Sequence, residues 1–93
     1  MSDFLSELVS LIADRKANPK EDSYTNKLLA DKTKAAQKVG EEATEVIVAA
    51  LAQSEQRLVE EMADLMYHSI VLLTSRGISW AEVVAELEKR HRA

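Results

Sequence analysis

Only two glycines and one proline interrupt the 93 residues of this chain. Both residue types disfavour helix interiors, glycine through its backbone entropy and proline through its missing amide hydrogen. Long stretches without them favour long helices joined by short turns. Apolar residues recur at helical spacing, and no stretch shows the alternation of a strand. The sequence therefore predicts an all-α fold, a helical bundle of four to five helices in a single domain over residues 1–93.

Capping residues and helix breakers divide the chain into five predicted helical segments. The segments are residues 3–16, 24–30, 32–52, 55–75 and 80–90. Ser2 or Asp3 is expected to cap the first segment. Gly77 is expected to close the fourth segment in the left-handed conformation. Ser79 and Glu82 match a capping box ahead of the last segment.

Two positions in the third segment leave alternatives open. Asp31 either caps this helix or marks a bend in a helix that continues from the second segment. Gly40 lies inside the segment, where glycine costs about 1 kcal/mol relative to alanine. It is either a tolerated small residue or a point where another backbone approaches closely.

The apolar positions predict which helix faces are buried. In the third segment they form one stripe, comprising Val39, Ala43, Val46, Ile47, Ala50 and Leu51. In the fourth segment the stripe comprises Leu58, Met62, Leu65, Ser69, Leu72 and Leu73. The second half of the fourth segment is apolar nearly all round and is expected to be the most buried element. In the last segment Val83, Val84 and Leu87 are expected to face inward. So short a chain has few helices to cover the fourth, which predicts a homodimer or a higher oligomer.

Carboxylates form two clusters, one on the third segment and one on the fourth. Glu42 and Glu45, and likewise Glu61 and Asp64, are three residues apart, which places each pair about 60° apart on one helix face. At about 6 Å and an effective dielectric of about 20, each pair costs on the order of 3 kcal/mol. If the two apolar stripes pack together, four carboxylates converge and need a counter-ion. Mg²⁺ suits them because it prefers oxygen ligands.

These acids resemble a known signature. Glu41-Glu42-x-x-Glu45, fifteen intervening residues, and then Glu61-x-x-Asp64 are similar to the motif of the all-α nucleoside triphosphate pyrophosphohydrolases, the MazG-like superfamily. Within it, four segments resemble the phosphoribosyl-ATP pyrophosphohydrolase family of histidine biosynthesis. They are SYTNKLL at 23–29, KVGEEATE at 38–45, EMADLMYH at 61–68 and RGIS at 76–79. Together they span nearly the whole chain.

The resemblance implies Mg²⁺-dependent hydrolysis of phosphoribosyl-ATP to phosphoribosyl-AMP and pyrophosphate. It assigns Glu42, Glu45, Glu61 and Asp64 as metal ligands, and Glu41 and Glu42 as catalytic residues. Glu41 could receive a proton from the attacking water, lie in an outer shell or only face solvent.

Basic and aromatic residues near the acids are candidate substrate contacts. Lys38 lies one turn before Glu42, and Lys34 lies one turn earlier. Both are candidates for binding phosphate, although each could simply form an i,i+4 ion pair. Tyr24 and Lys27 are candidate substrate contacts by resemblance only.

Several other residues are interpreted as packing residues. His68 follows Asp64 by four residues and could support a metal site, but a hydrogen-bonded core residue is the preferred interpretation. Trp80, Met62 and Met66 are interpreted as packing rather than as a base-stacking surface. The chain has no glycine-rich phosphate loop, so side chains and the metal are expected to bind the phosphates.

Composition argues against several other classes of protein. The net charge is −4 and the basic residues are scattered, which argues against a nucleic-acid partner. No apolar run approaches the roughly 20 residues of a membrane span, and the start lacks the basic region of a signal peptide. The absence of cysteine fits a reducing cytoplasm. Two alternatives remain: a housekeeping pyrophosphohydrolase acting on dUTP, dCTP or an abnormal nucleotide, and a non-catalytic helical interaction module.

Overall fold

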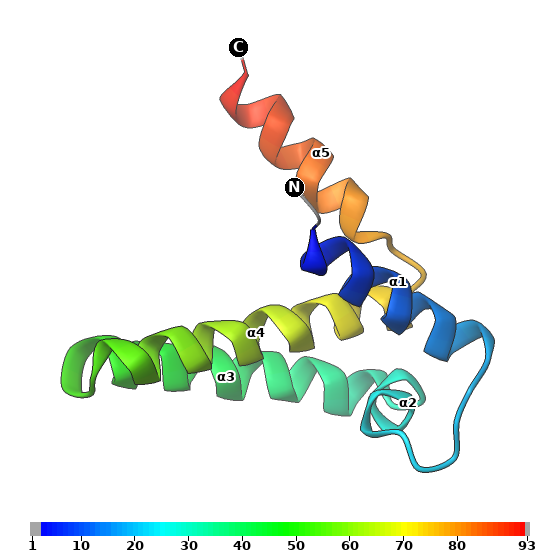
Figure 1. The fold of residues 1–93 in the computed structure, drawn as a ribbon, viewed down its shortest axis with the longest axis horizontal. Coiled ribbons are helices and arrows are strands. Elements are labelled where there is room, and N and C mark those ends of the chain that lie inside the picture. The colour runs from blue at the N-terminus through cyan, green and yellow to red at the C-terminus, as the bar shows by residue number, and fades with distance from the viewer. Residues whose placement is uncertain (1–2, 93) are drawn as a thin grey trace.

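A computed structural model describes residues 3–92, which form five α-helices and no strand, as the sequence predicts (Figure 1). The helices are α1 (Phe4–Ala17), α2 (Tyr24–Leu29), α3 (Lys32–Ala52), α4 (Glu55–Ser75) and α5 (Trp80–His91). The bounds of α3 and α4 agree with the predicted segments, and those of the other helices differ by one residue at one or both ends. Within the described range, no helix is long and apolar enough to cross a membrane.

The predicted capping residues account for these boundaries. The Asp3 carboxylate accepts a hydrogen bond from the Leu5 amide, while the alternative cap, Ser2, lies outside the described residues. Asp31 caps α3 by accepting from the Lys34 amide, so α2 and α3 are separate helices. Both hydrogen bonds of the capping box at the start of α5 are present.

Helices α3 and α4 form an antiparallel hairpin, and the other helices gather near one end of it (Figure 1). Helix α2 packs against α1, α3 and α4. Helix α5 contacts α4 and then projects away from the hairpin. The N-terminal end of α1 and the C-terminal end of α5 lie on the same side of the hairpin (Figure 1).

The core lies at the end of the hairpin that α1 and α2 cover. Its buried residues come from four helices and are Ile12, Leu28, Ala35, Ile70 and Val71. The second half of α4 is the most buried element, as predicted, because it supplies Ile70, Val71 and Ser75. The core fixes short α2 against α4.

The other half of the hairpin is less covered than the apolar stripes predict. On α3, Ile47 and Leu51 are 58% and 83% exposed, and Ala50 is also exposed. On α4, Met62 and Met66 are 46% and 40% exposed, so their interpretation as packing residues is wrong within this chain. Among residues 3–92, no other helix covers these side chains.

The buried face of α4 is rotated relative to the predicted stripe. Glu61 and His68, expected on its flank, are each only 6% exposed. Both side chains have polar partners in the structure: Arg57 pairs with Glu61, and Tyr24 contacts His68. Satisfied polar groups can be buried at modest cost, so the apolar pattern alone does not define the packed face.

The predicted inward face of α5 is wrong at two of its three positions, since only Val83 is half-buried. Val84 and Leu87 are 42% and 53% exposed, and α5 contains no buried residue. Only its beginning is anchored, because Trp80 packs against the core. The remainder projects beyond the neighbouring helices (Figure 1).

The two glycines should respond oppositely to alanine. Gly77 has φ +75°, so Gly77→Ala should lower the free energy of unfolding by about 1–2 kcal/mol. A methyl group at Gly40 meets no described atom within 4 Å, which favours the interpretation as a tolerated small residue. Gly40→Ala should raise stability by up to about 1 kcal/mol. Urea unfolding of both variants measures the difference, and equal losses would contradict it.

Candidate active site

Three carboxylates from α3 and α4 meet where the two helices face each other. Oxygen atoms of Glu42, Glu61 and Asp64 all lie within 4.8 Å of one another. Glu61 is buried, Glu42 is half-buried and Asp64 is exposed, so the cluster extends from the interior to solvent. Like charges this close repel one another, and a buried carboxylate in particular requires a compensating cation.

Two basic side chains provide part of that compensation. The Lys38 Nζ atom lies 3.5 Å from Glu42 Oε1 and 3.4 Å from Glu41 Oε1. The Arg57 Nη2 atom lies 2.7 Å from Glu61 Oε1, while its Nη1 atom pairs with Glu60. Within residues 3–92, Asp64 has no ion pair within 4.0 Å.

The other two predicted acids lie outside this group of three. Glu45 is exposed on α3, and its role as a ligand stays a prediction. Glu41 is also exposed and accepts a 2.8 Å hydrogen bond from Gln37 Nε2. That hydrogen bond, followed by the one from Lys38, lowers the pKa of Glu41. Its catalytic role stays a prediction.

The four predicted substrate contacts have different surroundings. Lys38 touches the acid cluster through Glu42. Lys34 and Lys27 are exposed, and their substrate roles stay predictions. Tyr24 is 49% exposed, but its hydroxyl lies 3.0 Å from His68 Nε2.

A hydrogen-bonded chain links Tyr24 to the backbone of Asp64. His68 Nδ1 lies 2.8 Å from the Asp64 carbonyl oxygen, which can only accept, so Nδ1 is assigned as the donor. In the neutral ring Nε2 then accepts from the Tyr24 hydroxyl. Both ring nitrogens have protein partners, which confirms that His68 is a hydrogen-bonded core residue.

Aromatic contacts strengthen the attachment of α2 to α4. The Tyr24 and Tyr67 rings are stacked with centroids 6.4 Å apart. The His68 ring meets both edge-on, at 5.9 Å and 5.0 Å. Thr25 also hydrogen-bonds to the Tyr67 hydroxyl. The start of α2 is therefore fixed about one helical turn from Asp64.

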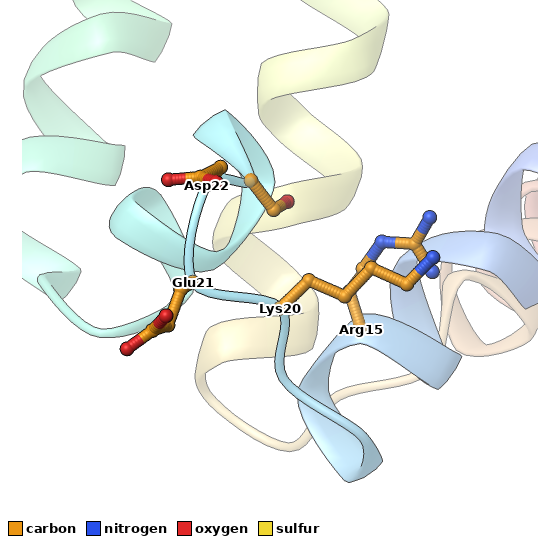
Figure 2. A pocket seen from close by; sticks show the side chains of 5 residues that line it. Arg15, Lys20, Glu21 and Asp22 are labelled. Atoms are coloured by element: carbon orange, nitrogen blue, oxygen red, sulfur yellow. The ribbon is translucent and has the colours of Figure 1, made fainter.

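A separate hollow of about 630 Å³ lies at the loop between α1 and α2 (Figure 2). Asn26 shapes this loop, because its side chain donates to the Arg15 carbonyl and accepts from the Lys20 amide. The Arg15 and Lys20 side chains extend in the same direction, and Glu21 and Asp22 lie on other sides of the loop (Figure 2). Two cations and two acids leave the hollow without a net charge that would select an anion.

Arg57 is the residue of the acid cluster that the motifs did not single out. It precedes Glu61 by four residues, a spacing at which helical side chains form ion pairs. The spacing was a usable signal, but many surface residues share it. What distinguishes Arg57 is the burial of its partner, which depends on how α4 packs against α3.

Comparison with known proteins shows similarity over nearly the whole chain. The sequence model of a family described as phosphoribosyl-ATP pyrophosphohydrolase matches residues 5–91. A phosphoribosyl-ATP pyrophosphatase of Sulfurisphaera tokodaii is 50% identical over 90 residues, covering 96% of each chain. Another, of Methanocella arvoryzae, is 43% identical over 95 residues, covering 99% of this chain and 100% of the relative. The histidine biosynthesis bifunctional protein HisIE of Xylella fastidiosa is 47% identical over 90 residues, covering 96% of this chain and 44% of that protein.

His68 should contribute far more to stability than a histidine with a similar local hydrogen bond. His68→Ala leaves a cavity and removes the partner of Tyr24, so it should cost about 2–4 kcal/mol. Tyr24→Phe should cost about 0.5–1.5 kcal/mol because it removes one hydrogen bond. His91 donates to the Leu87 carbonyl at 2.8 Å but is exposed, so His91→Ala is the matched control and should change little. Urea unfolding checks this order, and equal effects at both histidines would contradict it.

Proposed function

This chain belongs to the phosphoribosyl-ATP pyrophosphohydrolase family, and we propose that it hydrolyses phosphoribosyl-ATP to phosphoribosyl-AMP and pyrophosphate in a Mg²⁺-dependent reaction. This reaction is the second step of histidine biosynthesis. The observation that carries the proposal is the meeting of Glu42, Glu61 and Asp64 within 4.8 Å. These acids come from the two segments of the signature, and the tertiary structure brings them together.

The donor set fits a hard divalent cation. All three converging side chains offer carboxylate oxygens, which Mg²⁺ prefers. Asp64 supports the same conclusion, since within residues 3–92 it has no ion pair of its own although it lies close to two other carboxylates. Glu42, Glu61 and Asp64 would hold the ion, and we add Glu45, three residues after Glu42, as a fourth ligand. When bound, the ion neutralises phosphate oxygens and lowers the pKa of coordinated water.

Side chains around the acids are proposed to bind the substrate and to support the metal ligands. We propose that Lys38 binds a phosphate oxygen, which is supported by its position beside Glu42 and its 24% exposed side chain. We propose Lys34, Lys27 and Tyr24, which are all exposed, as further substrate contacts. Glu41 is exposed, lies outside the group of three acids and is engaged by Gln37 and Lys38, so we propose an outer-shell role for it.

The proposed activity is tested by pyrophosphate release with and without Mg²⁺. The substrates are phosphoribosyl-ATP, ATP, dUTP and dCTP, and phosphoribosyl-ATP should be strongly preferred. Glu42→Gln and Asp64→Asn should each lower kcat/KM by about a hundredfold or more, because each removes a ligand of the ion. Glu55→Gln, an exposed acid at the start of α4, is the control and should keep native activity.

The alternatives predict different results. A housekeeping enzyme would prefer a deoxynucleotide and still lose activity in both ligand variants. A non-catalytic interaction module would release no pyrophosphate, and the same substitutions would leave its stability unchanged or slightly raised by relieving repulsion. Full turnover in both variants would contradict the ligand assignment.

The exposed apolar surface of the hairpin supports a homodimer. Val59, Met62 and Met66 follow one stripe of α4, and together with Leu58 and Ala63 they line a shallow apolar hollow. Ile47 and Leu51 add exposed apolar area on α3. Contiguous apolar patches on a protein surface mark interaction sites. A second copy would supply the same surface and bury both.

Substitution on this surface should dissociate the dimer. Light scattering during gel filtration should give twice the mass of one chain for the native protein and the mass of a single chain for Met62→Lys. The control is Leu87→Lys on α5, which replaces a similarly exposed apolar residue and should remain dimeric. Dissociation by Leu87→Lys alone would place the interface on α5 and contradict the assignment to the hairpin.

A further inference from the structure

Arg57 connects an exposed acid to a buried one. Its Nη1 atom pairs with Glu60, whose side chain is 45% exposed. Its Nη2 atom lies 2.7 Å from Oε1 of Glu61, whose side chain is 8% exposed. Hydrogen bonding to Glu60, followed by attraction to Glu61, raises the pKa of Arg57 above its usual value. The guanidinium group is thus held in place by two acids with very different access to solvent.

The contact with Glu61 makes Arg57 a competitor for a metal ligand. Glu61 is the most buried of the three clustered acids, and Arg57 is its only ion-pair partner within 4.0 Å among residues 3–92. A guanidinium group and a divalent cation on one carboxylate repel each other. Occupation of the cluster by a cation therefore weakens the Arg57–Glu61 pair, and the pair in turn weakens binding of the cation.

We propose that Arg57 is a built-in counter-ion of the acid cluster, which stabilises Glu61 while the cluster is empty and moves off Glu61 when a divalent cation binds. This inference rests on the proposed function, since it requires the cluster to bind Mg²⁺. It assigns to Arg57 a role opposite to that of the signature acids: they bind the ion, whereas Arg57 weakens its binding by competing for Glu61.

Glu60 makes this movement feasible. Because Nη1 and Nη2 bond to different acids, the guanidinium group can release Glu61 and keep its hydrogen bond to Glu60. Arg57 is itself half-exposed, so the released nitrogen reaches water rather than an apolar interior. Gln56 Nε2 also donates to Glu60 Oε2 at 3.1 Å, while Arg57 bonds to the other oxygen, Oε1. The Glu60 carboxylate is therefore held in position beside Arg57 from both sides.

The role of Arg57 predicts two opposite changes in one variant. Arg57→Gln should lower the melting temperature without metal, because Glu61 loses its counter-ion. It should also enlarge the increase in melting temperature on adding Mg²⁺ and lower the Kd for Mg²⁺ by about tenfold. Melting temperatures across a Mg²⁺ titration give both quantities without any substrate. Arg57→Lys, which keeps the charge but makes a single-point contact, should fall between the two proteins.

Arg90→Gln is the matched control. Arg90 forms an i,i+4 pair with Glu86 at 2.8 Å on exposed α5, so this variant loses the same charge without touching the cluster. It should behave as the native protein does. An unchanged or higher Kd for Mg²⁺ in Arg57→Gln would overturn the proposal, a higher value indicating that Arg57 positions Glu61 as a ligand. A native protein that does not respond to Mg²⁺ would overturn the proposed metal site as well.

Displacement is distinguished from a general charge effect by nuclear magnetic resonance of the native protein. The Nε–Hε signal of Arg57, assigned by its loss in Arg57→Lys, should shift as Mg²⁺ is added, and that of Arg90 should not. If the Arg57 signal stayed in place while the metal bound, the guanidinium group would not be moving and the proposal would be wrong. Circular dichroism confirms that each variant retains the native helix content.

Discussion

The structure depends on the burial of one carboxylate between two long helices. Glu61 lies where α4 faces α3, close to Glu42 and Asp64 and paired with Arg57. Removing a carboxylate from water is costly, and attraction to a cation recovers that cost only with good geometry. This packing therefore requires a positive charge at the cluster at all times. In the proposed reaction cycle, Arg57 and Mg²⁺ meet that requirement in alternation.

His68 fixes the position of α2 relative to the acid cluster. This ring bonds to the carbonyl of Asp64 on one side and to the Tyr24 hydroxyl on the other. The core beneath, with Leu28 of α2 packed among residues of α1, α3 and α4, prevents α2 from moving independently. A short helix that would be marginal alone thus presents Tyr24 and Lys27 from a defined position.

The sequence predicts the helices far better than it predicts their packed faces. Caps such as Asp31 and Ser79 act through local hydrogen bonds, so their residue types identify helix ends directly. The burial of Glu61 and His68 depends instead on partners elsewhere in the fold, and apolar periodicity cannot register it. The acid signature predicts that Glu42, Glu61 and Asp64 are neighbours, because their spacing places them on facing sides of two helices that pair in an antiparallel hairpin. Arg57 was missed because an exposed i,i+4 pair and one with a buried partner look alike in sequence.

The N-terminal end of α1 and the C-terminal end of α5 lie on the same side of the α3–α4 hairpin (Figure 1). The acid cluster is formed by α3 and α4 instead, two helices that are joined by a two-residue turn. This arrangement suits covalent fusion, because a unit joined at α1 or α5 would be attached to helices that carry none of the three clustered acids. The bifunctional Xylella fastidiosa relative, of whose length this chain matches 44%, is consistent with such modular use.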